Sequence, residues 1–245
     1  GVIAQGGFGI EIILGIISLV TSLVAAVVGF GGGMLLIAIL PIFLAPSVII
    51  PVHGLVQLAS NSSRMLFSLE KVRWELLPQF LVGSILGSIV IGYGLSHIPM
   101  NYVPLAIGLY ILLNLWSPRF SALVTRYESF YLVGFLQTGL GLVVGATGPL
   151  GLSVLTKKLS CKDEIIATSS LFMTISHFAK IPVYLVITAS LFEDIGLIAY
   201  MVIGSVIGSY LGTKLRFKAK NEVVVKVIKI LLTLFAIRMV VGVAL

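Results

Sequence analysis

The sequence predicts an all-α integral membrane protein, and both its composition and its hydropathy pattern lead to that fold class. Of its 245 residues, 58% are hydrophobic and only 10% are charged, and the mean hydropathy is +1.16. A soluble domain carries about 25% charged residues, so this chain cannot hide its apolar surface from water by folding alone. Its apolar runs approach or exceed about 18 residues and lack strand-type alternation, which indicates membrane helices rather than a barrel.

A chain of this length holds roughly eight spans of about 20 residues, with short loops and no room for a soluble domain. Eight hydrophobic segments are found, at about residues 10–43, 47–68, 76–95, 101–116, 128–156, 164–189, 194–214 and 223–243. The first and fifth segments are too long for a simple span, and clusters of glycines interrupt them. We therefore expect two four-helix transmembrane repeats, residues 1–117 and 128–245, joined by a connecting loop at 118–127. The first helix of each repeat should be broken at its glycine-rich motif.

An internal duplication supports this division. Val28–Arg64 begins VGFGGGMLL and ends SNSSR, whereas Val144–Lys180 begins VGATGPLGL and ends SHFAK, at a shift of 116 residues. Further along, the GSILGS that starts at Gly83 matches the GSVIGS that starts at Gly204. A membrane chain built from two such halves is typical of a transporter whose site lies where the halves meet.

Counting spans predicts how the halves are related. Four spans per half is an even number, so the halves should be parallel, although a re-entrant hairpin at either break would reverse this conclusion. Basic residues after odd-numbered segments are Lys157, Lys158, Lys162, Lys214, Arg216, Lys218 and Lys220, and those after even-numbered segments are Lys71, Arg73, Arg119 and Arg126. The larger group is predicted to be cytoplasmic, which places both termini outside. The net charge of +7 lies in these loops and indicates contact with lipid headgroups, with no support for nucleic acid binding.

The two glycine motifs are candidate anion sites. Glycine permits dihedral angles that break a helix, and broken backbone survives in hydrocarbon only where it lines a cavity or is buried in protein. A half-helix that begins there directs free N–H groups and a positive dipole end into the membrane interior, which suits an anion. Close helix packing through small residues is the alternative. Two motifs at matching positions favour a site, whereas the Gly-Ser repeats at 83–88 and 204–209 are interpreted as packing faces.

A polar stripe follows each glycine motif. The first comprises His53, Gln57, Ser60, Asn61 and Arg64, and the second comprises Ser169, Met173, Ser176, His177 and Lys180. Their spacing puts each set on one face of a helix. Ionisable groups at membrane depth cost about 2.5 kcal/mol or more, so they are retained mainly for a task or a partner. No Asp or Glu lies deep in a predicted span, so a bound anion would supply the missing negative charge. Arg64 could instead extend to the loop near Lys71.

These features define the candidate substrate-binding residues. They are Gly31, Gly32, Gly33, Gln57, Ser60, Asn61, Arg64, Thr147, Gly148, Ser169, Ser176, His177 and Lys180. His177 could alternatively carry a proton near neutral pH or be a structural histidine. No P-loop, nucleophile elbow, HExxH motif or intramembrane carboxylate pair is present, so we expect no enzyme activity, no cofactor and no metal. The single cysteine, Cys161, excludes an intrachain disulfide.

The motifs together resemble a known family. GFGGGMLL at Gly29–Leu36 with Pro41, the stripe ending SNSSR, and the second copy GATGPLGL are similar to the TauE/SafE family of sulfite exporters, which includes toluenesulfonate uptake permeases. The likeness covers about residues 10–243. It implies an eight-span carrier of small sulfur-containing anions, such as sulfite or organosulfonates, in the plasma membrane of a bacterium or archaeon. In the second motif, Thr147 and Pro149 replace glycines, which argues against equal roles for the two halves.

The leading hypothesis is therefore a secondary transporter that works by alternating access at the interface of the repeats. Its expected partners are a small sulfur-containing anion and the lipid bilayer. The driving force would come from a proton or ion gradient, from the substrate gradient or from a partner. An anion channel and an assembly or scaffold protein that binds another membrane protein are the alternatives. The oligomeric state and the direction of transport do not follow from the sequence.

Overall fold

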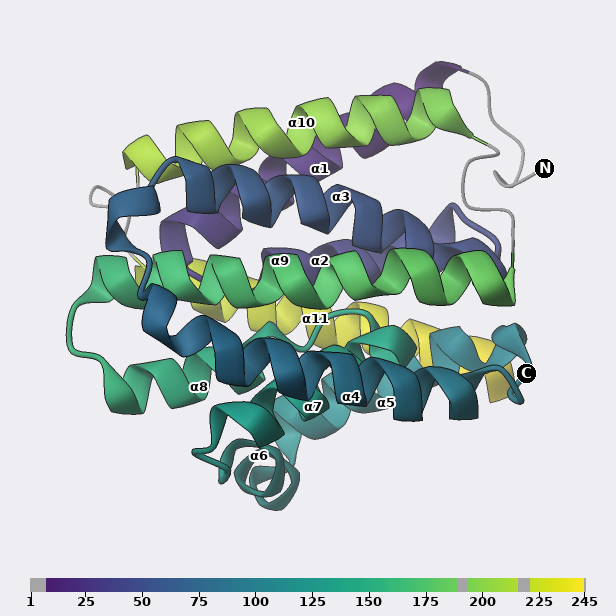
Figure 1. Cartoon of the computed structure of the whole chain (residues 1–245). Coiled ribbons are helices and arrows are strands. Elements are labelled where there is room, and N and C mark those ends of the chain that lie inside the picture. The colour runs from purple at the N-terminus through teal and green to yellow at the C-terminus, as the bar shows by residue number, and fades with distance from the viewer. Residues whose placement is uncertain (1–7, 189–193, 216–220, 245) are drawn as a thin grey trace.

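The computed structural model describes residues 8–188, 194–215 and 221–244, and every regular element in these ranges is helical (Figure 1). The α-helices are α1 (Phe8–Val28), α2 (Gly32–Ile39), α3 (Pro46–Leu66), α4 (Leu77–Leu95), α5 (Val103–Trp116), α6 (Pro118–Thr125), α7 (Phe130–Val144), α8 (Gly148–Lys158), α9 (Lys162–Ile187), α10 (Ile195–Leu215) and α11 (Asn221–Ala244). Short 3-10 helices cover Leu40–Ile42, Leu69–Lys71, Trp74–Leu76 and Met100–Tyr102. Helix α6 occupies most of the predicted connecting loop.

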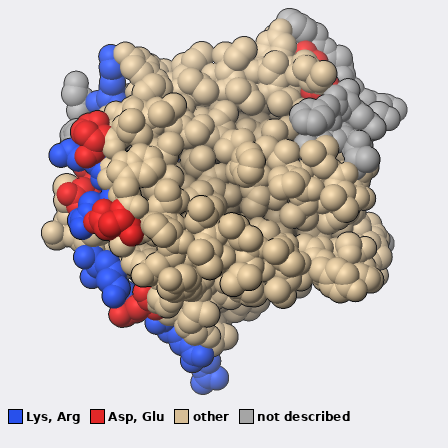
Figure 2. Space-filling model, in the orientation of Figure 1, with Lys and Arg blue, Asp and Glu red and all other residues tan. Residues whose placement is uncertain are grey.

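Four of the described helices are long and apolar enough to cross a membrane. They are Gly9–Val28, Trp74–Leu95, Lys162–Ile187 and Ile195–Leu215, and a fifth span results if Met100–Trp116 and Pro118–Thr125, which are bent by 97°, count as one. Large apolar side chains such as Ile89, Val186 and Ile203 are exposed on the outer surface. Figure 2 shows this apolar face, with Lys and Arg gathered at its left end. These features identify an integral membrane protein with four or five candidate spans.

The chain reverses direction at each glycine motif. Helix α1 ends at Val28, Gly29 and Gly31 adopt φ angles of 95° and 92°, and α2 then returns along α1. A Cβ atom at Gly32 would overlap the carbonyl oxygen of Thr21, which shows how closely the two helices pass. These positive φ angles lie in the left-handed region, where glycine carries no steric penalty. We refer to α1–α2 as the first hairpin.

The second motif makes a similar turn. Helix α7 ends at Val144, Gly145 has a φ of 85°, and α8 begins at Gly148. The amino end of α7 and the carboxyl end of α8 lie together, because Lys158 Nζ is 3.9 Å from Glu128 Oε2. We refer to α7–α8 as the second hairpin. Both long segments of the sequence therefore fold as helical hairpins rather than as interrupted straight spans.

Contacts between helices give their directions. Helix α3 runs parallel to α10, since Val56 lies at Ser205 and Ser60 lies at Ser209. Helix α1 is also parallel to α10, because Gly204 and Gly208 pack against successive turns of α1.

Three further helices run the other way. Helices α4 and α9 both run parallel to α7, since Gly83 and Gly87 pack against successive turns of α7, and Thr138 and Leu142 bond in the same order to Ser176 and Tyr184 of α9. Helices α3 and α9 are antiparallel, because Gly54 lies beside Lys180 whereas Arg73, beyond the end of α3, bonds to Glu164. Helices α1 and α7 occupy matching places in the duplication but run in opposite directions. The prediction of parallel halves therefore reverses, as expected for hairpins at the glycine motifs, because the hairpins add the change of direction that an even count of straight spans omits.

The basic loops also differ from the predicted arrangement. Arg73 Nη1 donates to Glu164 Oε2 at 2.9 Å, and Lys157 Nζ donates to the carbonyl oxygen of Thr125 at 3.2 Å. Hydrogen bonds from Arg73 to Glu164 and Glu75 raise the pKa of the Arg73 guanidinium above its ordinary value. The loops holding Arg73 and Arg126 therefore lie on the same side as Lys157, and the prediction of opposite sides is wrong. Arg216, Lys218 and Lys220 lie outside the described residues.

The Gly-Ser repeats form packing faces, as predicted. A Cβ atom at Gly83 would overlap the carbonyl oxygen of Tyr131 on α7, and one at Gly204 would overlap that of Gly15 on α1. Without Cβ atoms, the backbones of each pair approach closely. Helix α4 is thereby fixed to α7, and α10 to α1, so each hairpin is clamped by a helix from the other half of the sequence.

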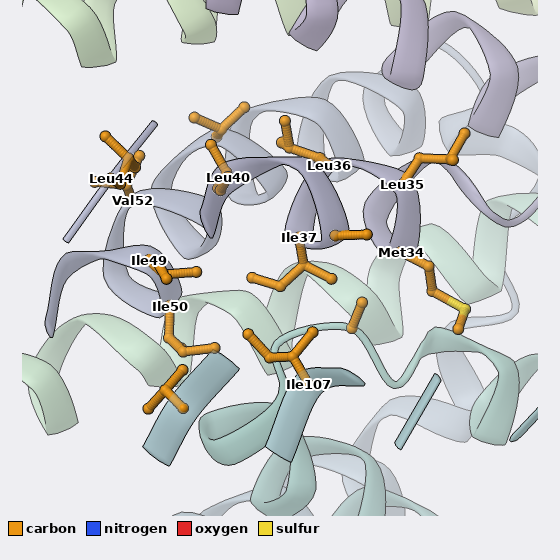
Figure 3. Packing of buried hydrophobic residues seen from close by; sticks show 14 of the residues in the cluster. Met34, Leu35, Leu36, Ile37, Leu40, Leu44, Ile49, Ile50, Val52 and Ile107 are labelled. Carbon is orange, nitrogen blue, oxygen red and sulfur yellow. The ribbon is translucent and has the colours of Figure 1, made fainter. Parts of the chain in front are cut away.

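Helix α2 is enclosed by protein. Its side chains Leu35, Leu36 and Ile37 are buried, and Figure 3 shows them among apolar side chains of α3 and of α5, including Ile50 and Ile107. The short helix does not need to present an apolar face to lipid, because neighbouring helices cover it. Protein cover of this kind is the condition under which an interrupted backbone persists at membrane depth.

Candidate functional site

A small buried cavity lies where the two hairpins meet α3 and α9. Its volume is about 30 Å³, and it is lined by Ala25, Gly29, Phe30, Gly31, Gly33, Met34, Gln57, Asn61, Arg64, Ala146, Gly148, Pro149, Leu152, Ser169, Met173 and His177. Such a space holds about one or two water molecules and is too small for an anion of several heavy atoms. Of the candidate residues, Gly31, Gly33, Gln57, Asn61, Arg64, Gly148, Ser169 and His177 line it, and the other five do not.

The amino ends of α2 and α8 both face this cavity. Gly31 and Gly33 contribute to it from the first hairpin, and Gly148 contributes from the second. Helix amino ends carry free N–H groups and a partial positive charge. On α8, Pro149 has no N–H, and the N–H groups of Leu150 and Gly151 already donate, to the carbonyl oxygen of Thr147 at 3.1 Å and to Gln137 Oε1 at 2.8 Å. The partial positive charge of both helix ends still faces the cavity, although few free N–H donors remain on α8.

Arg64 supplies the cation of the lining. Its side chain is 2% exposed, so it does not extend to the loop near Lys71. The Nη1 group donates to Asn61 Oδ1 at 3.0 Å, and the Nη2 group donates to Ser60 Oγ at 3.2 Å. Asn61 in turn donates to the carbonyl oxygen of Gln57 at 2.8 Å. These bonds along α3 hold the guanidinium at the wall of the cavity.

Lys180 lies one layer behind the cavity. It is fully buried, and its Nζ atom is 3.1 Å from His53 Nδ1 and 2.9 Å from His177 Nδ1. It also donates to the carbonyl oxygen of Gly145, at the turn of the second hairpin. His53 Nε2 is 2.8 Å from the carbonyl oxygen of Gly33, near the start of α2. Lys180 and His53 thus connect the two hairpin turns through side chains of α3 and α9.

His53 is a residue that the candidate set omits. Its place on the first polar stripe was the available signal, but its nearness to Pro51 and to a segment end argued against it. The structure places Pro51 inside α3, so His53 lies well within the helix. The sequence does not show that Lys180, from the other half, lies against it.

Three other candidates lie at helix crossings instead of at the cavity. Ser60 Oγ is 2.7 Å from Ser22 Oγ of α1, and Ser176 Oγ accepts from Gln137 Nε2 at 3.0 Å. Thr147 donates to the carbonyl oxygen of Gln137. These hydroxyl groups satisfy each other where helices touch. Ser60 does not line the cavity, but its hydroxyl group accepts a hydrogen bond from Arg64, which does. Ser176 and Thr147 bond to Gln137 and so help to position the second hairpin.

A wider depression adjoins the cavity. Its volume is about 550 Å³, and it shares Phe30, Gly31, Met34, Pro149 and Leu152 with the lining of the small cavity. Its other residues include two lysines and several hydroxyl and amide groups, namely Lys157, Lys229, Asn114, Ser121, Ser153 and Thr156. We call it the basic vestibule. The side chains shared by both spaces form the partition between the vestibule and the buried cavity.

No metal centre accompanies this arrangement in the described ranges, where no three His, Cys, Asp or Glu side chains gather as ligands. A protein-family model described as sulfite exporter TauE/SafE matches residues 14–239, nearly the whole chain. No curated protein and no solved structure matches the chain.

Proposed function

The chain belongs to the TauE/SafE family of sulfite exporters, a family of membrane transporters, and we propose that it exports small sulfur-containing anions such as sulfite or organosulfonates across the plasma membrane. The observation that carries the proposal is the buried cavity on which Arg64 and the amino ends of two half-helices converge. The proposed mechanism is alternating access, with the anion bound between the two halves of the chain.

The chemistry of the lining supports an anionic substrate. Within the described residues it contains one cation, Arg64, and no Asp or Glu. Side-chain amide and hydroxyl groups of Gln57, Asn61 and Ser169 can replace part of the hydration shell of an oxyanion. At low dielectric, a positive group and two helix amino ends attract an anion much more strongly than they would in water.

The size of the cavity supports a carrier with more than one state. It is too small for sulfite and is separated from the basic vestibule by Phe30, Met34 and Leu152. The cavity must therefore widen to admit the substrate, and we expect substrate binding to move the hairpins apart. The opposite directions of α1 and α7 fit inverted halves, which can exchange conformations and so open the site to either side. On this proposal the two halves are residues 1–117 and 128–245.

The charge distribution supports an orientation. The basic loops lie at one end of the molecule, and α1 begins and α11 ends at the other (Figure 1). The positive-inside rule then puts the loops and the basic vestibule in the cytoplasm and both termini outside. The exposed Cys161 lies just before α9, beside these loops, and is the single cysteine. A membrane-impermeant maleimide should label Cys161 only after cells are permeabilised, and labelling in intact cells would reverse the orientation.

The decisive experiment measures sulfite transport in proteoliposomes. Arg64→Gln should lower the rate about 10- to 100-fold, because a hydrogen bond to a charged group contributes about 1.5–3 kcal/mol. Arg119→Gln makes the same substitution at an exposed site and is the matched control. Wild-type rates in the Arg64 variant would contradict the proposed site.

The same vesicles separate the proposal from the alternatives. A carrier accelerates labelled uptake when unlabelled sulfite is present on the far side, whereas a channel conducts without this stimulation. If the wild-type protein transports neither sulfite nor any organosulfonate, the assembly or scaffold role gains support.

A further inference from the structure

Three titratable side chains meet behind the cavity, on α3 and α9. Lys180 Nζ lies within 3.1 Å of one imidazole nitrogen of His53 and one of His177. The two rings are 5.4 Å apart and cross at 71°. All three side chains are buried, and only His177 also lines the cavity. Since its Nδ1 atom contacts Lys180, Nε2 is the ring nitrogen left for a ligand in the cavity.

One assignment of donors and acceptors gives this cluster a single positive charge. An ammonium group has three N–H donors and no acceptor. As an ammonium group, Lys180 would use all three donors on its three partners, His53 Nδ1, His177 Nδ1 and the carbonyl oxygen of Gly145. The two Nδ1 atoms then accept and carry no proton, and His53 Nε2–H donates to the carbonyl oxygen of Gly33. In this arrangement each hydrogen bond has one donor and one acceptor, and the whole cluster carries a single positive charge.

A second proton cannot enter without breaking this pattern. If either Nδ1 atom took up a proton, its N–H would face an N–H of the Lys180 ammonium group. That imidazole would then have to move away from Lys180. Two positive charges this close also repel strongly in a buried site. An anion in the cavity would offset that repulsion, since His177 faces both the anion and Lys180. Bound anion and bound proton therefore favour each other, and this coupling is reciprocal.

Other charged groups around the cluster are few. Arg64 of α3 faces the same cavity and would share the anion. Tyr184, one turn beyond Lys180 on α9, donates its hydroxyl to the carbonyl oxygen of Leu142 on α7. Among the described residues, the first hairpin, α8 and the turn at Gly145 contribute no titratable side chain to the cavity lining or to the hydrogen bonds of Lys180. The second proton therefore has His53 and His177 as its acceptors.

Breaking the pattern would also release the hairpins. Lys180 holds the turn of the second hairpin through Gly145, and His53 holds the start of α2 through Gly33. We propose that His53, His177 and Lys180 form a proton-binding site that couples one proton to each transported anion, in the same direction, so that the concentration gradient of the anion itself drives export. The inference rests on the proposed anion transport. Uptake of a proton and an anion together loosens the contacts that keep the cavity occluded.

The test uses wild-type proteoliposomes that contain a pH-sensitive dye and an inward gradient of methanesulfonate. This anion of a strong acid carries no proton itself, so any acidification of the lumen reports protons moved by the protein. With the membrane potential clamped, we expect about one proton for each methanesulfonate taken up. Anion uptake without acidification, or with alkalinisation, would overturn the proposal. Failure to transport any sulfur anion would instead contradict the proposed function.

Histidine variants locate the site. His53→Gln keeps an acceptor for Lys180 but cannot take a proton, and it leaves the cavity lining intact. Its ratio of protons to anions should fall toward zero, and the ratio remains readable even if transport is slow. The exposed His97 is the third histidine of the chain, and His97→Gln should keep the wild-type ratio. If His53→Gln does not fold, His177→Gln serves as the second variant. A wild-type ratio in the folded variant would exclude the cluster as the site.

Discussion

The two halves of the chain differ in one corner of the structure, which is the space where a hairpin turn meets the side chains of α3 and α9. The shift of 116 residues maps Lys180, Gly145 and His53 onto Arg64, Gly29 and Ser169. In the second half, Lys180 bonds to both Gly145 and His53 and fills the corner. At the turn of the first hairpin, the three equivalent residues line the buried cavity. The same place is filled by a lysine side chain at one hairpin turn and hollow at the other.

A second difference lies along the seams between helices. Helix α10 packs closely on α3, where Ser209 Oγ donates to the carbonyl oxygen of Ser60 at 2.8 Å. The equivalent seam between α4 and α9 is open on the outer surface and leaves a groove of about 660 Å³, lined by apolar side chains such as Ile89 and Val183. The halves therefore share their sequence motifs, but the seam between α3 and α10 is closely packed and the seam between α4 and α9 is not. The following expectations test this comparison, from the largest effect to the smallest.

Removing the two buried cations should give unequal losses of stability. Lys180→Met leaves two imidazole nitrogens and one carbonyl oxygen without their donor, each at a cost of about 1–3 kcal/mol. Arg64→Met removes the donor to Asn61 and Ser60, two side chains of its own helix beside a cavity that can hold water, so we expect about 1 kcal/mol. Thermal unfolding in detergent measures both variants. Equal losses would show that the closed and open corners contribute alike.

The glycine seams should be equally sensitive in both halves. Gly83→Ala and Gly204→Ala each push a Cβ atom into a backbone carbonyl of a neighbouring helix and should cost about 1–3 kcal/mol. Gly94→Ala, on the same helix as Gly83, has no atom within 4 Å and should be neutral or stabilising by about 1 kcal/mol. Midpoints of detergent-induced unfolding compare the three. If Gly204→Ala leaves stability unchanged while Gly83→Ala lowers it, the two seams are not equivalent.

The hydroxyl groups at the helix crossings should contribute modestly. Ser22 joins α1 to α3 and α10, and Thr138 joins α7 to α9 and α4. Ser22→Ala and Thr138→Val should each cost about 1 kcal/mol, as expected for a lost hydrogen bond. The exposed Thr156 bonds only within its own helix, and Thr156→Val is the control. Thermal melts that show no difference between control and test variants would mean that these crossings are held by packing alone.

The basic surface should contribute least. Arg73→Ala removes two exposed ion pairs, with Glu75 and Glu164, and solvent screens such pairs. The contact of this loop with α9 persists, because the backbone N–H of Arg73 donates to Thr168 Oγ1. We expect an unchanged melting temperature and unchanged sulfite transport. A clear drop in either would show that the loop contributes to folding or transport as well as to the charge of that end of the molecule.

Much of the site follows from local sequence. Arg64 and His177 were identified because polar residues at helical spacing on an otherwise apolar segment must face protein rather than lipid, and both line the cavity. Ser60 and Ser176 share that spacing but bond to other helices. A hydroxyl group can satisfy itself at a helix crossing as readily as at a ligand, and spacing alone does not separate the two cases.

The sequence by itself determined the membrane character, the positions of most helices, the two points of interruption and the residue types available for an anion. These depend on hydropathy, periodicity and the dihedral freedom of glycine, which are properties of neighbouring residues. Only the tertiary structure decided that the chain turns back at Gly29 and Gly145, that Arg73 lies beside Glu164, and that Lys180 reaches His53. A glycine allows a turn without giving its direction, and the direction is fixed by packing between helices that are far apart in the chain, such as α1 and α10.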